Sequence, residues 1–205
     1  MSRIISDSVE CPTCRASVSI QLYQTVNVSI DPALKERVLN RSINCAKCPK
    51  CDQEIEVGAN LLYHDMKKEL MVWLRVDKAR DGDFPVQRRT LRIVHDYSTL
   101  IEKIRIFDTE IDDCLLEFLK FMLWPQTSGK NLEEYRGDEI RFIGMRQAAQ
   151  GESLFFQLTS TDGVKHFSFP KSEAIKIAPT VAKARAAASS GSWRIVDRDF
   201  VMTKL

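Results

Sequence analysis

Two pairs of cysteines carry the clearest chemistry in the sequence. Cys11 and Cys14 belong to a Cys-Pro-x-Cys motif, which returns at Cys48 and Cys51. A tight turn lets two thiolates of one segment bind the same ion, at about 2.3 Å in the case of Zn²⁺. The proline fixes φ and stiffens that turn. We therefore predict a closed, structural Zn²⁺ site, with no open position for water, made by Cys11, Cys14, Cys48 and Cys51.

Other chemistries remain open for these cysteines. Because Cys45 precedes Cys48 by three residues, residues 45–51 also read Cys-x-x-Cys-x-x-Cys, a string that can hold an iron–sulfur cluster. Mononuclear iron also fits four sulfurs, so iron is not excluded, and Cys45 could replace Cys48 as a ligand. A thioredoxin-like redox pair needs a helix after the motif, whereas extended patterns follow here. Cys114 lies in a helical pattern and is predicted to be a core residue.

Strands must position the two cysteine pairs, because polar and apolar residues alternate after both of them. Asp31-Pro32 is a typical helix start, and an apolar stripe continues to about Asn40. Strands are predicted over residues 15–22, 26–30, 53–57, 61–63 and 70–74. Together these patterns predict a zinc-ribbon-like β domain with one inserted helix over residues 1–75.

The rest of the chain is predicted to be a mixed α+β region over residues 90–205, after a linker or long loop over 76–89 that carries Gly82 and Pro85. Apolar residues at helical spacing predict a helix pair, the second helix stopping at Pro125. Two strands around Gly163 are expected to form a hairpin. The fold class predicted for the whole chain is therefore α+β.

Charge argues against a dedicated nucleic-acid binder. The chain has 30 Lys and Arg against 28 Asp and Glu, whereas a protein that neutralises several phosphates needs a clear basic excess. One dense basic stretch, Arg88, Arg89 and Arg92, keeps a nucleic-acid-associated regulator as an alternative. No apolar run approaches the ~20 residues of a membrane helix, and the first residues resemble no secretory signal. We therefore expect a cytoplasmic protein without membrane contact, whose thiols stay reduced.

No catalytic motif is recognisable. The sequence lacks His-Glu-x-x-His, Gly-x-Ser-x-Gly and a glycine-rich phosphate loop. Asp112, Asp113 and His64 could form the acidic and histidine site of an uncharacterised enzyme. A helix N-terminus accounts for the two aspartates without catalysis, and a histidine at the end of a strand commonly bonds a turn. We therefore favour a protein that is not an enzyme.

The cysteine motifs and the residues around them resemble those of the CpXC domain of bacteria and archaea. The similarity extends over residues 9–75 and includes both Cys-Pro-x-Cys motifs, Asp31-Pro32, Asn44 and Tyr63-His64-Asp65. Asp52 departs from the glycine that often follows a zinc knuckle. The resemblance implies a metal site and a bacterial origin, and it implies no reaction. The function expected from the sequence is a non-enzymatic, zinc-binding, bacterial protein-interaction module, whose partner is not identified by its residues.

Overall fold

The computed structural model describes residues 2–77, 89–109, 111–129, 131, 140–149, 151–161, 163–189 and 191–205. Among these residues, 2–77 and 89–101 form one compact unit, and those from 102 onward form a second. Helix α2 (Tyr97–Asp108) contributes residues to both. Strands and helices occur in each unit, so the predicted α+β class is confirmed.

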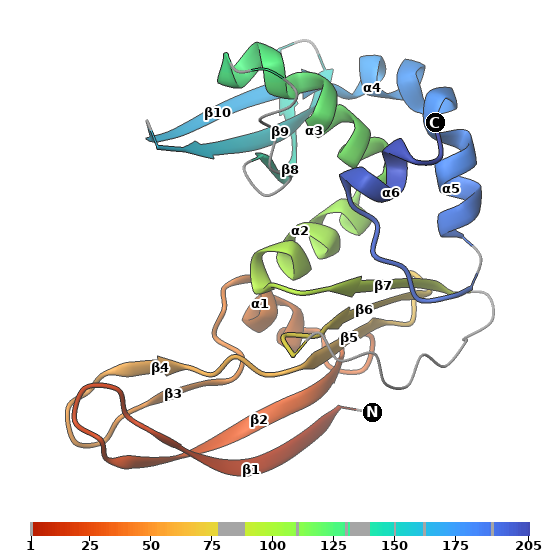
Figure 1. Cartoon of the computed structure of the whole chain (residues 1–205). Coiled ribbons are helices and arrows are strands. Elements are labelled where there is room, and N and C mark those ends of the chain that lie inside the picture. The colour runs from red at the N-terminus through yellow and green to blue at the C-terminus, as the bar shows by residue number, and fades with distance from the viewer. Residues whose placement is uncertain are drawn as a thin grey trace. The chain divides into compact units, whose positions relative to one another are not determined.

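The first unit is built on a five-stranded sheet in the order β1-β2-β5-β6-β7 (Figure 1). Its strands are β1 (Arg3–Glu10), β2 (Ser17–Asn27), β5 (Leu61–Asp65), β6 (Leu70–Leu74) and β7 (Thr90–Val94). Helix α1 (Ala33–Leu39) follows Asp31-Pro32 as predicted, and it buries Leu34 and Val38. A separate antiparallel pair, β3 (Cys45–Lys47) and β4 (Glu54–Glu56), holds the second cysteine motif.

Strand β7 packs with the first unit, although the sequence analysis grouped it with the C-terminal region. It pairs in parallel with β6, so that Leu70 lies beside Thr90 and Leu74 beside Val94. Leu91 and Val94 are buried, and the burial of these apolar side chains favours this position. Most of the expected linker, residues 78–88, lies outside the described residues.

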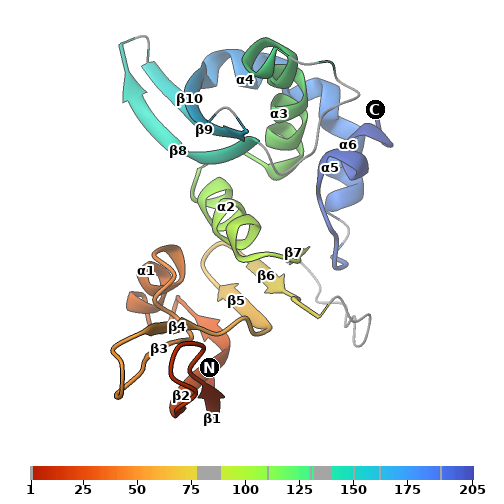
Figure 2. The ribbon, with the colours of Figure 1, turned by 60° about the vertical axis from the view of Figure 1, so that its left-hand side comes forward.

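The second unit packs helices against a three-stranded antiparallel sheet in the order β10-β9-β8 (Figure 2). The strands are β8 (Ile140–Ala148), β9 (Gly151–Ser160) and β10 (Gly163–Pro170). The helices are α3 (Asp113–Ser128), α4 (Lys171–Ile177), the 3₁₀ helix η2 (Ala178–Val181), α5 (Ala182–Ala188) and α6 (Arg198–Met202). Trp124, Phe142 and Phe156 are among the side chains at the centre of this core. The predicted hairpin is confirmed, with Gly163 opposite Ser160.

The predicted stop at Pro125 is wrong, because α3 continues to Ser128. Proline removes one backbone donor and usually breaks a helix. Here the hydroxyl groups of Thr127 and Ser128 donate to the carbonyls of Leu123 and Trp124, at 2.9 and 2.7 Å. Gly129, at φ 70°, then ends the helix in the left-handed conformation. These hydroxyl bonds add to the backbone pairing of the last turn, and the carbonyl that Pro125 cannot serve is that of Phe121, four residues earlier.

Candidate metal centre

The two cysteine motifs form the turns of two hairpins and have the same local structure. The first joins β1 to β2 and the second joins β3 to β4. In each turn the N–H of the first cysteine donates to the carbonyl five residues later, as Cys11 does to Ala16 and Cys48 to Gln53. The N–H of the residue after the second cysteine donates back to the first cysteine's carbonyl, at 2.9 Å in both turns.

Both turns place a residue other than glycine in the left-handed region, directly after the second cysteine. Arg15 has φ 57° and Asp52 has φ 59°. Aspartate tolerates this region better than arginine does. Glycine is therefore absent from this position in both turns, at residue 15 as well as at residue 52. The backbone bonds of both turns hold the conformation without glycine.

The four sulfurs converge at the ends of the two hairpins. The Sγ atoms of Cys11, Cys14, Cys48 and Cys51 all lie within 4.8 Å of one another. Cys11 Sγ lies 3.5 Å from Cys51 Sγ, and Cys14 Sγ lies 3.6 Å from Cys48 Sγ. A tetrahedron with metal–sulfur bonds of about 2.3 Å has edges of about 3.8 Å, whereas a disulfide needs about 2.05 Å. The donor set and its spacing therefore fit one tetrahedral ion, and all six cysteines are free thiols.

The backbone of the turns favours thiolates at the first cysteine of each motif. The N–H of Cys14 holds the pKa of Cys11 at about 6, below its ordinary value of 9.0. The N–H of Lys50 likewise lowers the pKa of Cys48. For Cys51 the N–H of Gln53 lowers the pKa, but burial and the other three sulfurs outweigh it and raise it to about 12. Four thiolates this close need a cation to balance them.

These pKa values predict how a bound metal responds to acid. Protons compete with the metal for thiolates, and Cys11 takes up its proton only as the pH falls through about 6. The folded-state pKa of Cys11 lies below its ordinary value. The stabilisation that the Cys11 thiolate gives the folded state is therefore complete above the ordinary pKa and is lost as the pH falls through the lowered pKa. We expect acid to release the metal progressively, because every thiolate that takes up a proton is lost as a ligand. A colorimetric chelator would follow the release, and release already complete at neutral pH would contradict the prediction.

Little apolar material supports the ends of the two hairpins. Their buried core consists of Cys11, Val18, Cys48 and Ile55. The first cysteine of each motif is fully buried, whereas Cys14 is half-buried and Cys51 is exposed. The two aliphatic side chains of this core, Val18 and Ile55, contribute about 3–6 kcal/mol together, at about 1.5–3 kcal/mol each. The stability of the two hairpin ends therefore depends on an ion that links the four sulfurs.

The remaining cysteines lie apart from this group. The thiol of Cys45 donates to the carbonyl of Arg41 at 2.9 Å, and burial raises the pKa of that thiol. Cys114 is buried in the core of the second unit, as predicted. Among the described residues the grouped sulfurs are those of the two Cys-Pro-x-Cys motifs, and Cys45 does not join them.

Asn44 connects the second hairpin to the main sheet. Its side chain is buried, accepts from the N–H of Tyr23 at 2.7 Å and donates to the carbonyl of Tyr23 at 3.1 Å. The Asn44 side chain therefore bonds both backbone groups of Tyr23, as a residue of a neighbouring strand would. Its own carbonyl accepts from the N–H of Val57, and its φ is 54°. In the sequence, Asn44 stands out only as part of the resemblance to the CpXC domain.

Replacing this amide should separate the hairpin from the sheet. Asn44→Ala leaves the N–H and the carbonyl of Tyr23 without these partners, and we expect a loss of about 2 kcal/mol in the free energy of unfolding. Asn44→Asp keeps the acceptor and removes the donor, so a smaller loss is expected. Urea unfolding of both variants checks this order, and equal stability of Asn44→Ala and the unaltered protein would contradict it.

The residues considered for catalysis have other partners. Asp112 caps α3 by accepting from the N–H of Leu115 at 3.0 Å, and it pairs with Arg185. Asp113 is fully buried and pairs with Lys103 at 3.0 Å. His64 belongs to the first unit, where its Nε2 contacts the guanidinium of Arg89. His64 thus belongs to the first unit and the two aspartates belong to the second, and neither unit contains all three.

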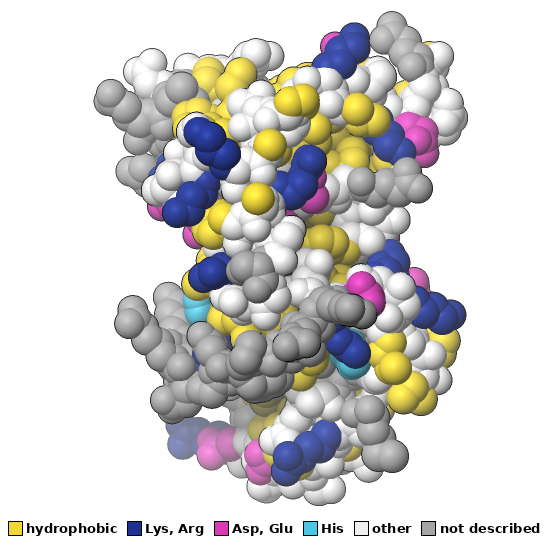
Figure 3. Space-filling view, turned by 90° about the vertical axis from the view of Figure 1, so that its right-hand side faces the viewer, with side chains coloured by type: hydrophobic (Ala, Val, Ile, Leu, Met, Phe, Trp, Pro, Cys, Tyr) yellow, Lys and Arg dark blue, Asp and Glu magenta, His cyan; other side chains and the backbone are white. Residues whose placement is uncertain are grey.

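The basic stretch considered for nucleic acid is divided. Arg92 is buried, and its guanidinium donates to the carbonyl of Leu91, so the prediction that it could contact nucleic acid is wrong. Strand β7 is buried on both faces from Leu91 to Val94, so Arg92 has no exposed position there. Arg89 is partly exposed, and Arg88 lies outside the described residues. On the face shown in Figure 3, Lys and Arg side chains are interspersed with Asp and Glu.

Comparison with known proteins adds one finding. The family described as "CpXC protein" matches residues 9–120, more than half of the chain. The match includes both cysteine motifs, the whole sheet of the first unit from β2 onward, and α2. No curated protein and no solved structure matches the chain. Among the helices of the described segments, none is both long and apolar enough to cross a membrane.

Proposed function

Because the chain belongs to the CpXC family, we propose that it binds one Zn²⁺ in a structural site and acts as a non-enzymatic protein that engages another protein in the bacterial cytoplasm. The ligands are Cys11, Cys14, Cys48 and Cys51. The observation that carries the metal site is the convergence of their four sulfurs within 4.8 Å. Four sulfurs fill a tetrahedral shell and leave no position for a substrate or a reactive water.

Zinc is favoured over iron by the identity and surroundings of the donors. Zn²⁺ takes four thiolates with no electronic preference of its own and forms such closed sites commonly. Cys45, which an iron–sulfur string would use, bonds the carbonyl of Arg41 instead. Lys47 pairs with Asp52 at 3.1 Å on the solvent-exposed side of the second turn. A bound Zn²⁺ would link the two hairpins and offset half of the negative charge of the four thiolates.

Elemental analysis of freshly purified protein tests the metal. We expect one zinc per chain, an absorption spectrum without the bands of iron–thiolate centres, and loss of the zinc in Cys11→Ser. Cys114→Ser is the matched control and should keep its zinc, since that thiol lies in the other unit. Iron in place of zinc would overturn the identity of the metal, and the absence of both would overturn the site.

A protein partner is supported by an exposed apolar pair at one end of the sheet. Ile30 is 66% exposed and Met66 is 48% exposed. The two are neighbours, because the hydroxyl of Ser29 accepts from the N–H of Met66 at 2.8 Å. Exposed apolar side chains that lie together are the kind of feature from which a contact surface is built. The near-neutral charge of the chain also suits a protein partner better than a nucleic acid.

Capture from lysate of the native cells tests this part. Tagged protein should retain a partner that the double variant Ile30→Asp/Met66→Asp fails to retain. Val164→Asp, a change at an exposed apolar residue of the other unit, is the control and should retain it. Equal capture by the double variant would overturn the contact surface, and a complex lost after treatment with nuclease would favour the nucleic-acid alternative.

A further inference from the structure

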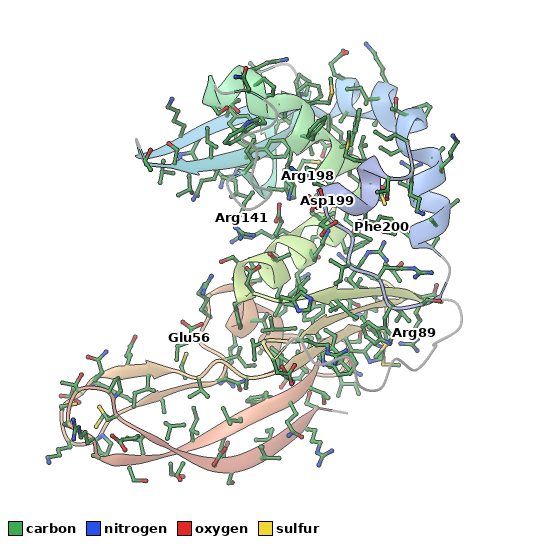
Figure 4. All side chains as sticks on the ribbon, in the orientation of Figure 1. Glu56, Arg89, Arg141, Arg198, Asp199 and Phe200 are labelled. Carbon is green, nitrogen blue, oxygen red and sulfur yellow. The ribbon has the colours of Figure 1, made fainter. Side chains whose placement is uncertain are left out.

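One face of the five-stranded sheet carries a histidine and an arginine side by side. In the antiparallel register His64 on β5 lies opposite Met71 on β6, and Met71 in turn lies beside Leu91 on β7. Side chains that share a register position share a face. Arg89 directly precedes β7 (Figure 4), and its guanidinium reaches across the β6 position to bond the Nε2 of His64.

This contact leaves the charge of Arg89 unbalanced. A guanidinium is always cationic and only donates, so its usual partner is a carboxylate or a phosphate. Here it donates to a neutral imidazole nitrogen, and no described carboxylate lies within ion-pair distance of it. Both side chains are only partly exposed, which makes an unbalanced cation more costly than it would be in water.

Asp65, the acidic residue next to His64 in the sequence, is already engaged elsewhere. Asp65 accepts from the backbone N–H groups of Lys67 and Lys68 and from the hydroxyl of Ser29 in the turn between β5 and β6. It contributes to the field at His64, but it does not pair with Arg89. Among the described residues the charged groups that act on His64 are therefore Arg89 and Asp65.

We propose that Arg89 and His64 form a binding site for a small phosphate dianion. The guanidinium offers two parallel donors that match two oxygens of a phosphate. His64, once its Nε2 is protonated, becomes a second cationic donor beside it. A phosphate supplies the negative charge that the described side chains lack, and this site is independent of the cysteines because none of its residues contacts them.

Binding and protonation of His64 are coupled in this arrangement. Burial and the charge of Arg89 lower the pKa of His64 in the free protein. A bound dianion reverses that effect, because an opposite charge a few ångströms away favours the imidazolium. By linkage the phosphate binds more tightly as the pH falls through the pKa of His64.

Histidine NMR of the full-length protein measures this coupling directly. The three histidines give separate imidazole signals, so His95 and His166 are internal references. His95 bonds the carbonyl of Arg75 and His166 is exposed on β10. In inorganic phosphate we expect the pKa of His64 to rise by about one unit relative to sodium chloride of equal ionic strength, while the two references stay unchanged.

Two variants separate the site from a general salt effect. In Arg89→Gln the pKa of His64 should rise without phosphate and should no longer depend on it. Arg146→Gln, a change at a cation of the second unit that stacks on Phe155, should behave as the unaltered protein. Equal shifts of all three histidines, or a phosphate response that survives Arg89→Gln, would overturn the proposal. Tighter binding of a single-stranded oligonucleotide than of inorganic phosphate would overturn the assignment to a small anion.

Discussion

Cys48→Ser is expected to lose the metal and to unfold the hairpin ends of the first unit. Structural Zn²⁺ contributes about 10–16 kcal/mol of apparent binding free energy in small zinc domains, more than Val18 and Ile55, the buried aliphatic side chains at this site, can supply. A serine oxygen is a poor substitute for a thiolate with a lowered pKa. The hairpins should then become accessible to protease between about residues 10 and 57, while the second unit stays folded.

The matched control is Cys45→Ser, on the same hairpin. Cys45 is exposed, bonds the carbonyl of Arg41 and does not belong to the group of four sulfurs. This variant should bind one metal per chain and resist protease as the unaltered protein does. Elemental analysis and limited proteolysis followed by mass spectrometry give both readouts. A Cys48→Ser protein that keeps its metal and its protected hairpins would contradict the proposed ligand set.

The cysteine group was predictable because its determinants are local. A Cys-Pro-x-Cys turn presents its two sulfurs through its own backbone bonds, and two such turns have few ways to complete a shell. The alternation after each motif also predicted the strands β2 and β4 correctly. The matching spacing favoured Cys48 over Cys45, and the structure places Cys48, not Cys45, among the four converging sulfurs.

Elements that depend on distant partners were not predictable in the same way. Strand β1 contains the polar run Ser6-Asp7-Ser8 and is largely exposed, so it has little hydrophobic pattern of its own. It becomes a strand because β2 supplies a complete antiparallel partner from Arg3 to Glu10. The position of β7 in the first unit likewise depends on parallel pairing with β6. Local patterns do not encode such long-range pairing.

A buried network of charged side chains in the second unit was not predicted from the sequence. Lys103 on α2 lies 3.0 Å from Asp113 and 3.3 Å from Glu117 on α3. Lys120 bonds Glu117 at 2.8 Å and Glu102 at 3.2 Å, and all five side chains are almost inaccessible to solvent. A signal was present, since Asp113, Glu117 and Lys120 follow the spacing i, i+4, i+7 and share one face of α3.

The network is balanced and tied to the backbone. Arg141 on β8 lies 3.5 Å from Glu102, so three carboxylates face three cations among the described residues. Glu102 also accepts from the N–H of Phe142 at 2.8 Å, and Lys103 donates to the carbonyl of Val196 at 2.6 Å. Burial lowers the pKa of Lys103, but Asp113 and Glu117 outweigh burial and raise it. Because the folded-state pKa is raised, the stabilisation persists through neutral pH and is lost only as the pH rises through that pKa.

Lys103→Met should therefore destabilise the second unit by about 3–5 kcal/mol, because it leaves buried carboxylates without their cation. The double variant Lys103→Met/Asp113→Asn removes one charge of each sign and should recover much of that loss. Lys165→Met, at an exposed position on β10, should change stability little. Urea unfolding measures all three, and the metal content should stay unchanged in each, in contrast to Cys48→Ser. If Lys103→Met were no less stable than Lys165→Met, or if the double variant were less stable than the single one, the network would not hold α2, α3 and β8 together in the way described.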